Sequence, residues 1–203
     1  MGRSEFVPEV FFDLSLFPFA KVFDGVVYVW DVLPKLSKFI ASSFKENVTV
    51  GEGTIVEEGA FIKGPAIIGK NCLISHGAYL RENCIIGDRV TIGHACEIKN
   101  SIILNKTAVA HLSYIGDSVV GGNVNVGGGV ICANFRFDEK PIVVRIGKTK
   151  IDTKLQKFGA IIGDGTKIGV NTALNPGTIL GKNCIVFPQT SALGVHKEGK
   201  IIK

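Results

Sequence analysis

The sequence lacks features on which several classes of protein depend. It has only 7 prolines and almost no segment with helical periodicity among its 203 residues, which favours a β architecture. It has no stripe of Lys and Arg with interleaved aromatic residues, the pattern typical of nucleic-acid-binding proteins. We therefore expect no nucleic acid among its partners.

Membrane and export segments are also missing. The most apolar stretch, Phe6 to Trp30, is interrupted by Glu9, Asp13 and Asp24, whereas a membrane-spanning helix needs about 20 nearly continuous apolar residues. No basic head, apolar middle and small-residue cleavage site mark a signal peptide. The sequence thus predicts a cytoplasmic protein with no membrane partner, whose N-terminal segment covers one end of the core.

Glycine is abundant, with 25 residues beside a hydrophobic content of 46% and a charged content of 20%. This composition is that of a soluble globular chain with many tight corners. The net charge of +5 is mild and fits small anionic ligands better than a polyanion.

A six-residue repeat is the main feature of the sequence. Aliphatic residues recur at a spacing that matches neither the helix period of about 3.6 nor the strand period of about 2. The spacing falls from six residues to five at two places after Ile98, and the six-residue repeat resumes at Ile162. The aliphatic positions are Val50, Val56, Ile62, Ile68, Ile74, Leu80, Ile86, Ile92, Ile98, Ile103, Val109, Ile115, Val120, Val126, Ile162, Ile168, Leu174, Leu180 and Val186.

Small side chains stand four positions after most of these aliphatic residues, and Gly, Asn, Asp and Lys crowd the positions between. The pattern predicts an all-β fold, a hexapeptide-repeat solenoid in which three short strands form a triangular coil of about 18 residues. Four cysteines, at 72, 84, 96 and 184, occupy the small inward position and are interpreted as buried hydrophobic residues. Cys132 stays open, and no C-x-x-C spacing indicates zinc.

The repeat divides the chain into three parts. We predict an N-terminal cap or linker over residues 1–45, the solenoid domain over 46–190 and a tail over 191–203 that is too short to assign. An inserted arm over 135–160 interrupts the repeat, and its Gly147-Lys148 turn between two β-rich runs predicts a hairpin. The arm's lysines could reach a coenzyme's phosphates or a neighbouring subunit, although a solvated surface is the simpler interpretation. They are Lys148, Lys150, Lys154 and Lys157.

Basic residues recur at the coil period, because Lys63, Arg81 and Lys99 are 18 apart and each follows an inward aliphatic residue. They should form a vertical cationic ladder, which is unfavourable unless an anion lies between the charges. A phosphate would suit this position. The alternative is that the side chains spread into solvent and pair with Glu58, Glu82 or Glu97.

Histidines follow the same order, with His76, His94 and His111 each two residues beyond an inward aliphatic residue on one face. We expect them to stack. Three histidines raise the possibility of zinc, and the γ-class carbonic anhydrases are hexapeptide solenoids with such a site. That family needs two histidines five residues apart, and the residue five after His111 is Gly116. We therefore predict no metal, while solvent-facing corners explain His76 and His94 equally well.

A longer run of residues is more specific than the generic repeat. It contains Glu97-Ile-Lys-Asn, Val109-Ala-His-Leu-Ser-Tyr-Ile-Gly-Asp, Asn123-Val-Asn-Val-Gly-Gly-Gly and Cys132-Ala-Asn-Phe. This run resembles the acetyltransferase domain of the bifunctional glucosamine-1-phosphate acetyltransferase / N-acetylglucosamine-1-phosphate uridylyltransferase family. The stretch Asn134 to Lys140 and the arm that follows are similar to archaeal-type sugar-phosphate nucleotidyltransferases. The resemblance implies a left-handed parallel β-helix and a homotrimer with active sites between subunits.

The resemblance also implies roles for individual residues. His111 would be the general base that removes a proton from the sugar ammonium. An imidazole suits this role because its unperturbed pKa is about 6.5. Arg81 and Lys99 would bind the sugar phosphate, as the cationic ladder indicates independently. Tyr114, Asn125 and Lys140 would orient the sugar and its phosphate, although corner asparagines and an edge-covering tyrosine have structural explanations as well.

The co-substrate implied by the resemblance is acetyl-coenzyme A. Asn134 would lie near the acetyl carbonyl and could support a developing oxyanion, and Asn134, Phe135 and Val170 would contact the coenzyme. Two of these depart from the bacterial pattern, because Phe135 stands in place of a tyrosine and Val170 in place of a serine. No Gly-rich nucleotide-binding unit precedes the repeat, so we expect acetylation without activation of the sugar.

The leading hypothesis is therefore an acetyl-coenzyme A-dependent N-acetyltransferase that acts on an amino-sugar 1-phosphate, glucosamine 1-phosphate first, on the route to UDP-N-acetylglucosamine. A second hypothesis is acyl transfer to another amino-sugar or nucleotide-sugar acceptor. A third is a catalytically silent solenoid that binds a sugar phosphate.

Overall fold

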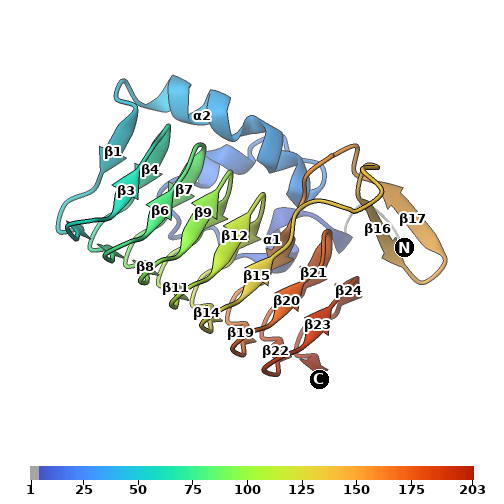
Figure 1. Cartoon of the computed structure of the whole chain (residues 1–203). Coiled ribbons are helices and arrows are strands. Elements are labelled where there is room, and N and C mark those ends of the chain that lie inside the picture. Colours follow the sequence, from blue (N-terminus) through green and yellow to red (C-terminus); the bar gives the residue numbers. More distant parts are fainter. Residues whose placement is uncertain (1–4) are drawn as a thin grey trace.

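The structure is a computed structural model that describes residues 5–203, and its chain winds into a parallel β-solenoid (Figure 1). Three long sheets form its sides, and we name them A, B and C in the order in which each coil reaches them. The predicted all-β solenoid is confirmed.

The strands of the three sheets are short, as a coil with three corners requires. Sheet A contains β1 (Val48–Val50), β4 (Ala66–Ile68), β7 (Cys84–Ile86), β10 (Ile102–Ile103), β13 (Val119–Val120), β18 (Ala160–Ile162), β21 (Thr178–Leu180) and β24 (Val195–His196). Sheet B contains β2 (Ile55–Val56), β5 (Leu73–Ile74), β8 (Thr91–Ile92), β11 (Ala108–Val109), β14 (Asn125–Val126), β19 (Lys167–Ile168), β22 (Ile185–Val186) and β25 (Ile201–Ile202). Sheet C contains β3 (Phe61–Ile62), β6 (Tyr79–Leu80), β9 (Glu97–Lys99), β12 (Tyr114–Gly116), β15 (Ile131–Cys132), β20 (Ala173–Leu174) and β23 (Ser191–Ala192).

The register of the strands reproduces the repeat. Ala66 pairs with Cys84, one coil of 18 residues further on. Two later coils are one residue shorter than this. Ile85 pairs with Ile102, and Ile102 pairs with Val119. The missing residue comes from the corner between sheets C and A, so the turn is tighter there.

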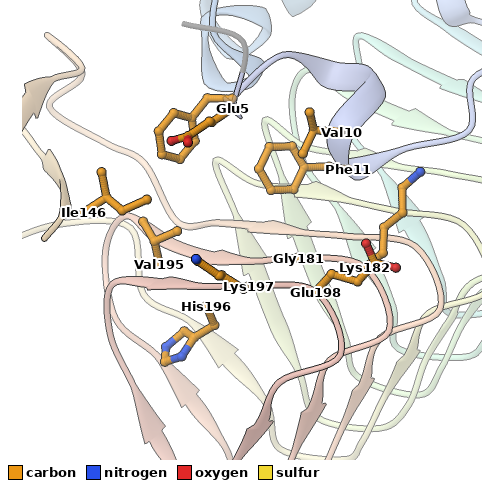
Figure 2. Close-up of a pocket in the computed structure, with 11 residues that line it drawn as sticks. Glu5, Val10, Phe11, Ile146, Gly181, Lys182, Val195, His196, Lys197 and Glu198 are labelled. Atoms are coloured by element: carbon orange, nitrogen blue, oxygen red, sulfur yellow. The ribbon is translucent and has the colours of Figure 1, made fainter. Parts of the chain in front are cut away.

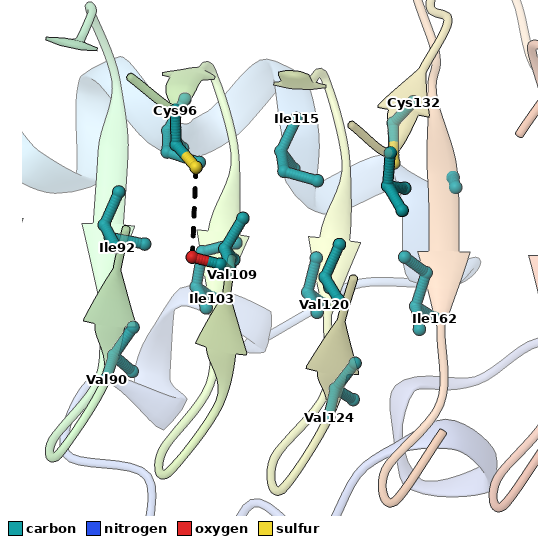
Figure 3. Close-up of a cluster of buried hydrophobic side chains, with 14 of the residues drawn as sticks. Val90, Ile92, Cys96, Ile103, Val109, Ile115, Val120, Val124, Cys132 and Ile162 are labelled. Atoms are coloured by element: carbon teal, nitrogen blue, oxygen red, sulfur yellow. Dashed lines mark hydrogen bonds between the residues drawn. The ribbon is translucent and has the colours of Figure 1, made fainter. Parts of the chain in front are cut away.

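The inward residues form one continuous core, part of which Figure 3 shows. The predicted aliphatic positions from Ile68 to Val186 are buried in it, whereas Val50 and Val56 of the first coil are about two-fifths exposed because no coil covers them. All five cysteines are buried and free. Burial raises the pKa of Cys84 and Cys132 to about 12, so these thiols are packing groups, as predicted for four of the five and now found for Cys132.

The N-terminal segment covers a side of the solenoid and not an end, which corrects our expectation. Its helices are α1 (Pro8–Phe11), η2 (Ala20–Phe23), η3 (Val29–Lys35) and α2 (Leu36–Ser43). Their apolar residues, Trp30 among them, pack on the outward side chains of sheet A, such as Ile67 and Ile85. Figure 1 shows the segment running along the stack of coils. The N-terminal segment packs on sheet A because the strands of this sheet are apolar on both faces.

Two further segments complete the molecule. The arm forms the predicted antiparallel hairpin, β16 (Val143–Ile146) and β17 (Thr149–Asp152), beside the N-terminal segment. The C-terminal residues extend the solenoid through β23, β24 and β25, beyond the predicted limit at residue 190. Within residues 5–203, no helix is both long and apolar enough to cross a membrane.

Candidate active site

A hollow lies at the corner where sheet C turns into sheet A. It has a volume of ≈ 290 Å³. Four of the predicted site residues line it, Arg81, Lys99, Tyr114 and Asn134, together with Phe135 from the predicted coenzyme set. Lys157, on the returning end of the arm, completes the lining.

The solenoid brings these side chains together by register. Tyr114 on β12 pairs with Glu97 on β9, and Glu97 pairs with Tyr79 on β6, so residues at equal positions stack from coil to coil. Arg81 directly follows β6, and Lys99 ends β9. The predicted ladder of Arg81 and Lys99 therefore exists along one edge.

Carboxylates neutralise this ladder. Arg81 contacts Glu97 at 2.9 Å and Glu82 at 3.5 Å, and Lys63 contacts Glu82 at 3.1 Å. The hydrogen bond to Glu97 raises the pKa of Arg81 above its ordinary value. The alternative prediction of glutamate partners thus holds for Lys63 and Arg81.

Asp117 is the partner of Lys99, and our sequence analysis missed it. It lies at the tight corner with φ +47° and is 4% exposed. Lys99 donates to both of its carboxylate oxygens, at 2.9 and 3.2 Å. The side-chain amides of Asn100 and Asn134 donate to the same carboxylate, at 2.9 and 2.5 Å. Asp117 therefore fixes three polar side chains around the hollow, two of which line it.

Tyr114 is held over the hollow as a neutral phenol. The amide of Asn134 donates to its hydroxyl oxygen at 3.1 Å. Burial, followed by the charges of Asp117 and Glu97, raises the pKa of Tyr114. Its hydroxyl proton thus stays in place at neutral pH, where it can be donated to a ligand oxygen.

His111 lies on an exposed corner between β11 and β12, where sheet B turns into sheet C. His94 and His76 occupy the same corner one and two coils earlier, and their rings stack with centroids 5.8 Å apart. Each of those rings uses Nδ1 to bond a carbonyl of the preceding coil, at 2.7 Å for His94 and 2.6 Å for His76. In the described part of the chain the His111 ring makes neither contact, so it does not join the predicted stack.

Three other predicted residues do not line the hollow. Asn125 points outward from sheet B, Val170 is exposed at the corner after β19, and Lys140 is exposed on the arm. One copy of the chain therefore brings together Arg81, Lys99, Tyr114, Asn134 and Phe135, but not the whole predicted set. Residues 5–203 contain no cluster of three His, Cys, Asp or Glu side chains that could hold a metal ion.

A second hollow of ≈ 330 Å³ lies between the N-terminal segment, the hairpin and the last coil (Figure 2). Its walls include Phe6, Phe11, Ile146 and Val195, and none of the predicted site residues lines it. The lining also contains the polar and charged residues Glu5, Lys182, His196, Lys197 and Glu198. The choice of the first hollow as the candidate active site therefore rests on the predicted residues that line it.

Comparisons with known proteins agree with the fold. The family model described as the GMPPB C-terminal domain matches residues 62–146. The bifunctional protein GlmU of Methanococcus maripaludis is 49% identical over 176 residues, covering 80% of this chain and 43% of that protein. The bifunctional sugar-1-phosphate nucleotidylyltransferase/acetyltransferase of Sulfurisphaera tokodaii is 39% identical over 92 residues, covering 45% of this chain and 23% of that protein.

Among solved structures, Arabidopsis UDP-N-acetylglucosamine acyltransferase aligns with a TM-score of 0.58 and 16% identity, covering 75% of this chain and 56% of that one. The chain is thus a left-handed parallel β-solenoid of the hexapeptide-repeat class, as the resemblance implied. Within that class its sequence is similar to part of the GlmU proteins. It spans less than half the length of the GlmU relative from Methanococcus maripaludis.

Proposed function

We propose that this chain transfers an acetyl group from acetyl-coenzyme A to the amine of an amino-sugar 1-phosphate, with glucosamine 1-phosphate as the first choice of acceptor. The observation that carries the proposal is the hollow in which Arg81 and Lys99, one coil apart, lie beside the neutral Tyr114. The two cations can bind a phosphate, and the phenol can donate to a sugar oxygen.

The phosphate end of the acceptor would contact Arg81 and Lys99. Arg81 is partly exposed, so it can turn from Glu97 to a phosphate at little cost. Lys99 is held by Asp117 and would keep its position while it donates to the ligand. Tyr114 would donate its hydroxyl proton to an oxygen of the sugar.

The amine end would approach the exposed ring of a His111 supplied by a neighbouring copy, because within one chain this residue lies at the corner before β12 and the hollow lies at the corner after it. His111 would remove a proton from the ammonium, and the freed amine would attack the thioester carbon. The N–C bond then forms, the C–S bond breaks, and the coenzyme leaves as a thiolate that takes up a proton. The relatives named as bifunctional GlmU and as an acetyltransferase support this choice of reaction.

The role proposed for Asn134 differs from the predicted one, which was to support an oxyanion at the acetyl carbonyl. Both protons of its amide are donated, one to Tyr114 and one to Asp117. Donation to an oxyanion would require one of these bonds to be exchanged. We therefore assign Asn134 chiefly to the orientation of Tyr114, while Phe135, which also lines the hollow, is placed to contact the acetyl donor.

The complete site would form between copies of the chain. Asn125 and Val170 project from sheet B or its following corner, away from the hollow on sheet C, so only a neighbouring copy could bring such residues to it. Sheet A is covered by the N-terminal segment, which leaves sheets B and C for association. A homotrimer satisfies both conditions.

The test is an assay of free thiol release with acetyl-coenzyme A and a panel of acceptors. We expect glucosamine 1-phosphate or galactosamine 1-phosphate to be acetylated faster than the unphosphorylated sugars. If a nucleotide-linked amino sugar reacted much faster than both 1-phosphates, the proposed acceptor class would be wrong.

A further inference from the structure

We propose that Lys157, delivered by the inserted arm, is a third cation for the anionic group of the acceptor and makes the site select phosphorylated over unphosphorylated amino sugars. The inference rests on the proposed function and names a specificity residue within it. Lys157 lines the hollow with Arg81 and Lys99, although it is 58 residues later in the chain than Lys99.

The arm is inserted at the corner that carries the site. It leaves the solenoid after β15 and returns at β18, which is the turn from sheet C to sheet A. Arg81 and Lys99 lie at the same turn in earlier coils. An insertion here can therefore reach the hollow without crossing another face of the solenoid.

The returning end of the arm is fixed by backbone hydrogen bonds on both sides of the hollow. The amide of Phe158 donates to the carbonyl of Asn134 at 2.9 Å, and the amide of Gly159 donates to the carbonyl of Asp117 at 2.8 Å. The ring of Phe158 is fully buried, with its centroid 5.9 Å from that of Trp30. Lys157 directly precedes these anchored residues, so its backbone has a defined place at the rim.

The close approach at Gly159 shows how tightly this end is seated. A Cβ atom at Gly159 would lie 2.2 Å from the carbonyl oxygen of Gly116 and 2.3 Å from the hydroxyl of Ser118. Only glycine lets the returning chain come this near to the corner. A loop without such anchors would not hold Lys157 beside the ladder.

The charges around the hollow give Lys157 its importance. Lys63, Arg81 and Lys99 have carboxylate partners in Glu82, Glu97 and Asp117. Within residues 5–203, Lys157 makes no ion pair. It therefore supplies the net positive charge that draws a phosphate dianion into an otherwise balanced set of charges.

The experiment compares K157A with K150A, a control that removes an exposed lysine of β17 outside the hollow. Both side chains are exposed, so both variants should fold. We expect K157A to raise the KM for glucosamine 1-phosphate by about tenfold, with kcat nearly unchanged and the KM for acetyl-coenzyme A unchanged. K150A should match the wild type, and K157R should recover most of the affinity.

A binding measurement separates this inference from the proposed function. Calorimetric titration with N-acetylglucosamine 1-phosphate should show the same loss of affinity in K157A, while titration with N-acetylglucosamine should show none. If K157A and K150A have equal KM values and equal dissociation constants, the role of Lys157 is overturned. If the wild-type protein neither acetylates nor binds any amino-sugar phosphate, the proposed function fails first.

Discussion

At the scale of the residue, the site depends on one carboxylate that the repeat pattern did not reveal. Asp117 occupies a tight corner where a positive φ favours Asn, Asp or Gly, so its identity alone resembled a turn residue. Its importance comes from contacts with Lys99 and Asn134, which lie 18 and 17 residues away. Contacts of this kind are set by coil register and side-chain rotamers, which the sequence does not specify.

Replacing Asp117 with Asn tests this contact. Asn tolerates the same backbone conformation, so D117N removes the charge and leaves Lys99 with no buried counter-ion. We expect the free energy of unfolding in urea to fall by about 3 kcal/mol and the KM for the acceptor to rise. D138N, which removes an exposed partner of Arg136, should not change either value, and equal behaviour of the two variants would contradict the account.

His196 makes the stability of the folded state depend on pH. It pairs in register with Leu180 and so takes an inward position in the last coil, and burial lowers its pKa below the ordinary value. The folded state thus favours the neutral ring, and the unfolded state binds more protons as the pH falls through about 6.5. Stability should therefore decrease towards acid pH.

H196L removes this titration. The free energy of unfolding of H196L, relative to the wild type, should increase between about pH 8 and about pH 5. Urea denaturation at the two pH values measures it. A difference that stays constant with pH would show that His196 is not responsible.

At the scale of the element, the sequence predicted the solenoid and the hairpin but not the place of the N-terminal segment. The six-residue rhythm reports only which residues point inward. The outward residues of sheet A, such as Ile67 and Ile85, are each followed by an inward aliphatic residue. Such pairs of adjacent apolar residues fit the six-residue repeat, so the repeat alone does not reveal that sheet A has a second apolar face. That face binds the N-terminal segment and also the arm through Phe158.

The arm's return to the solenoid is testable at Gly159. G159A places a Cβ within 2.2 Å of a backbone oxygen, which should reduce the free energy of unfolding by about 2 kcal/mol or more and raise the KM for the acceptor by displacing Lys157. G128A is the control, because a Cβ there would meet its nearest atom at 3.5 Å. Thermal denaturation compares the two variants. Equal stability of G159A and G128A would contradict the account.

At the scale of the whole molecule, a single chain brings together part of the predicted site but not all of it. The resemblance assigned Asn125 and Val170 to the same site as Arg81, yet they lie on or beside a different sheet. No periodicity within one chain can report a contact between copies. The structure brings together the predicted residues of sheet C that share a register, and the roles of the whole predicted set stay predictions.

Self-association is the corresponding prediction. Light scattering should give the mass of three chains of 21.7 kDa each. I131R, which places a charge on the outward face of sheet C at a residue 40% exposed in one copy, should weaken the trimer. V27R, at a 46% exposed residue of the N-terminal segment, should not, and a monomeric wild-type protein would contradict this part of the account.

The measurement that tests the central claim most directly is the rate of acetyl transfer by H111A beside H94A, two exposed corner histidines one coil apart. If His111 accepts the proton of the sugar amine, H111A should lose about 10²- to 10⁴-fold in kcat with the KM for the sugar phosphate little changed. H94A should keep the wild-type rate. Equal rates in both variants would show that this corner takes no part in the reaction.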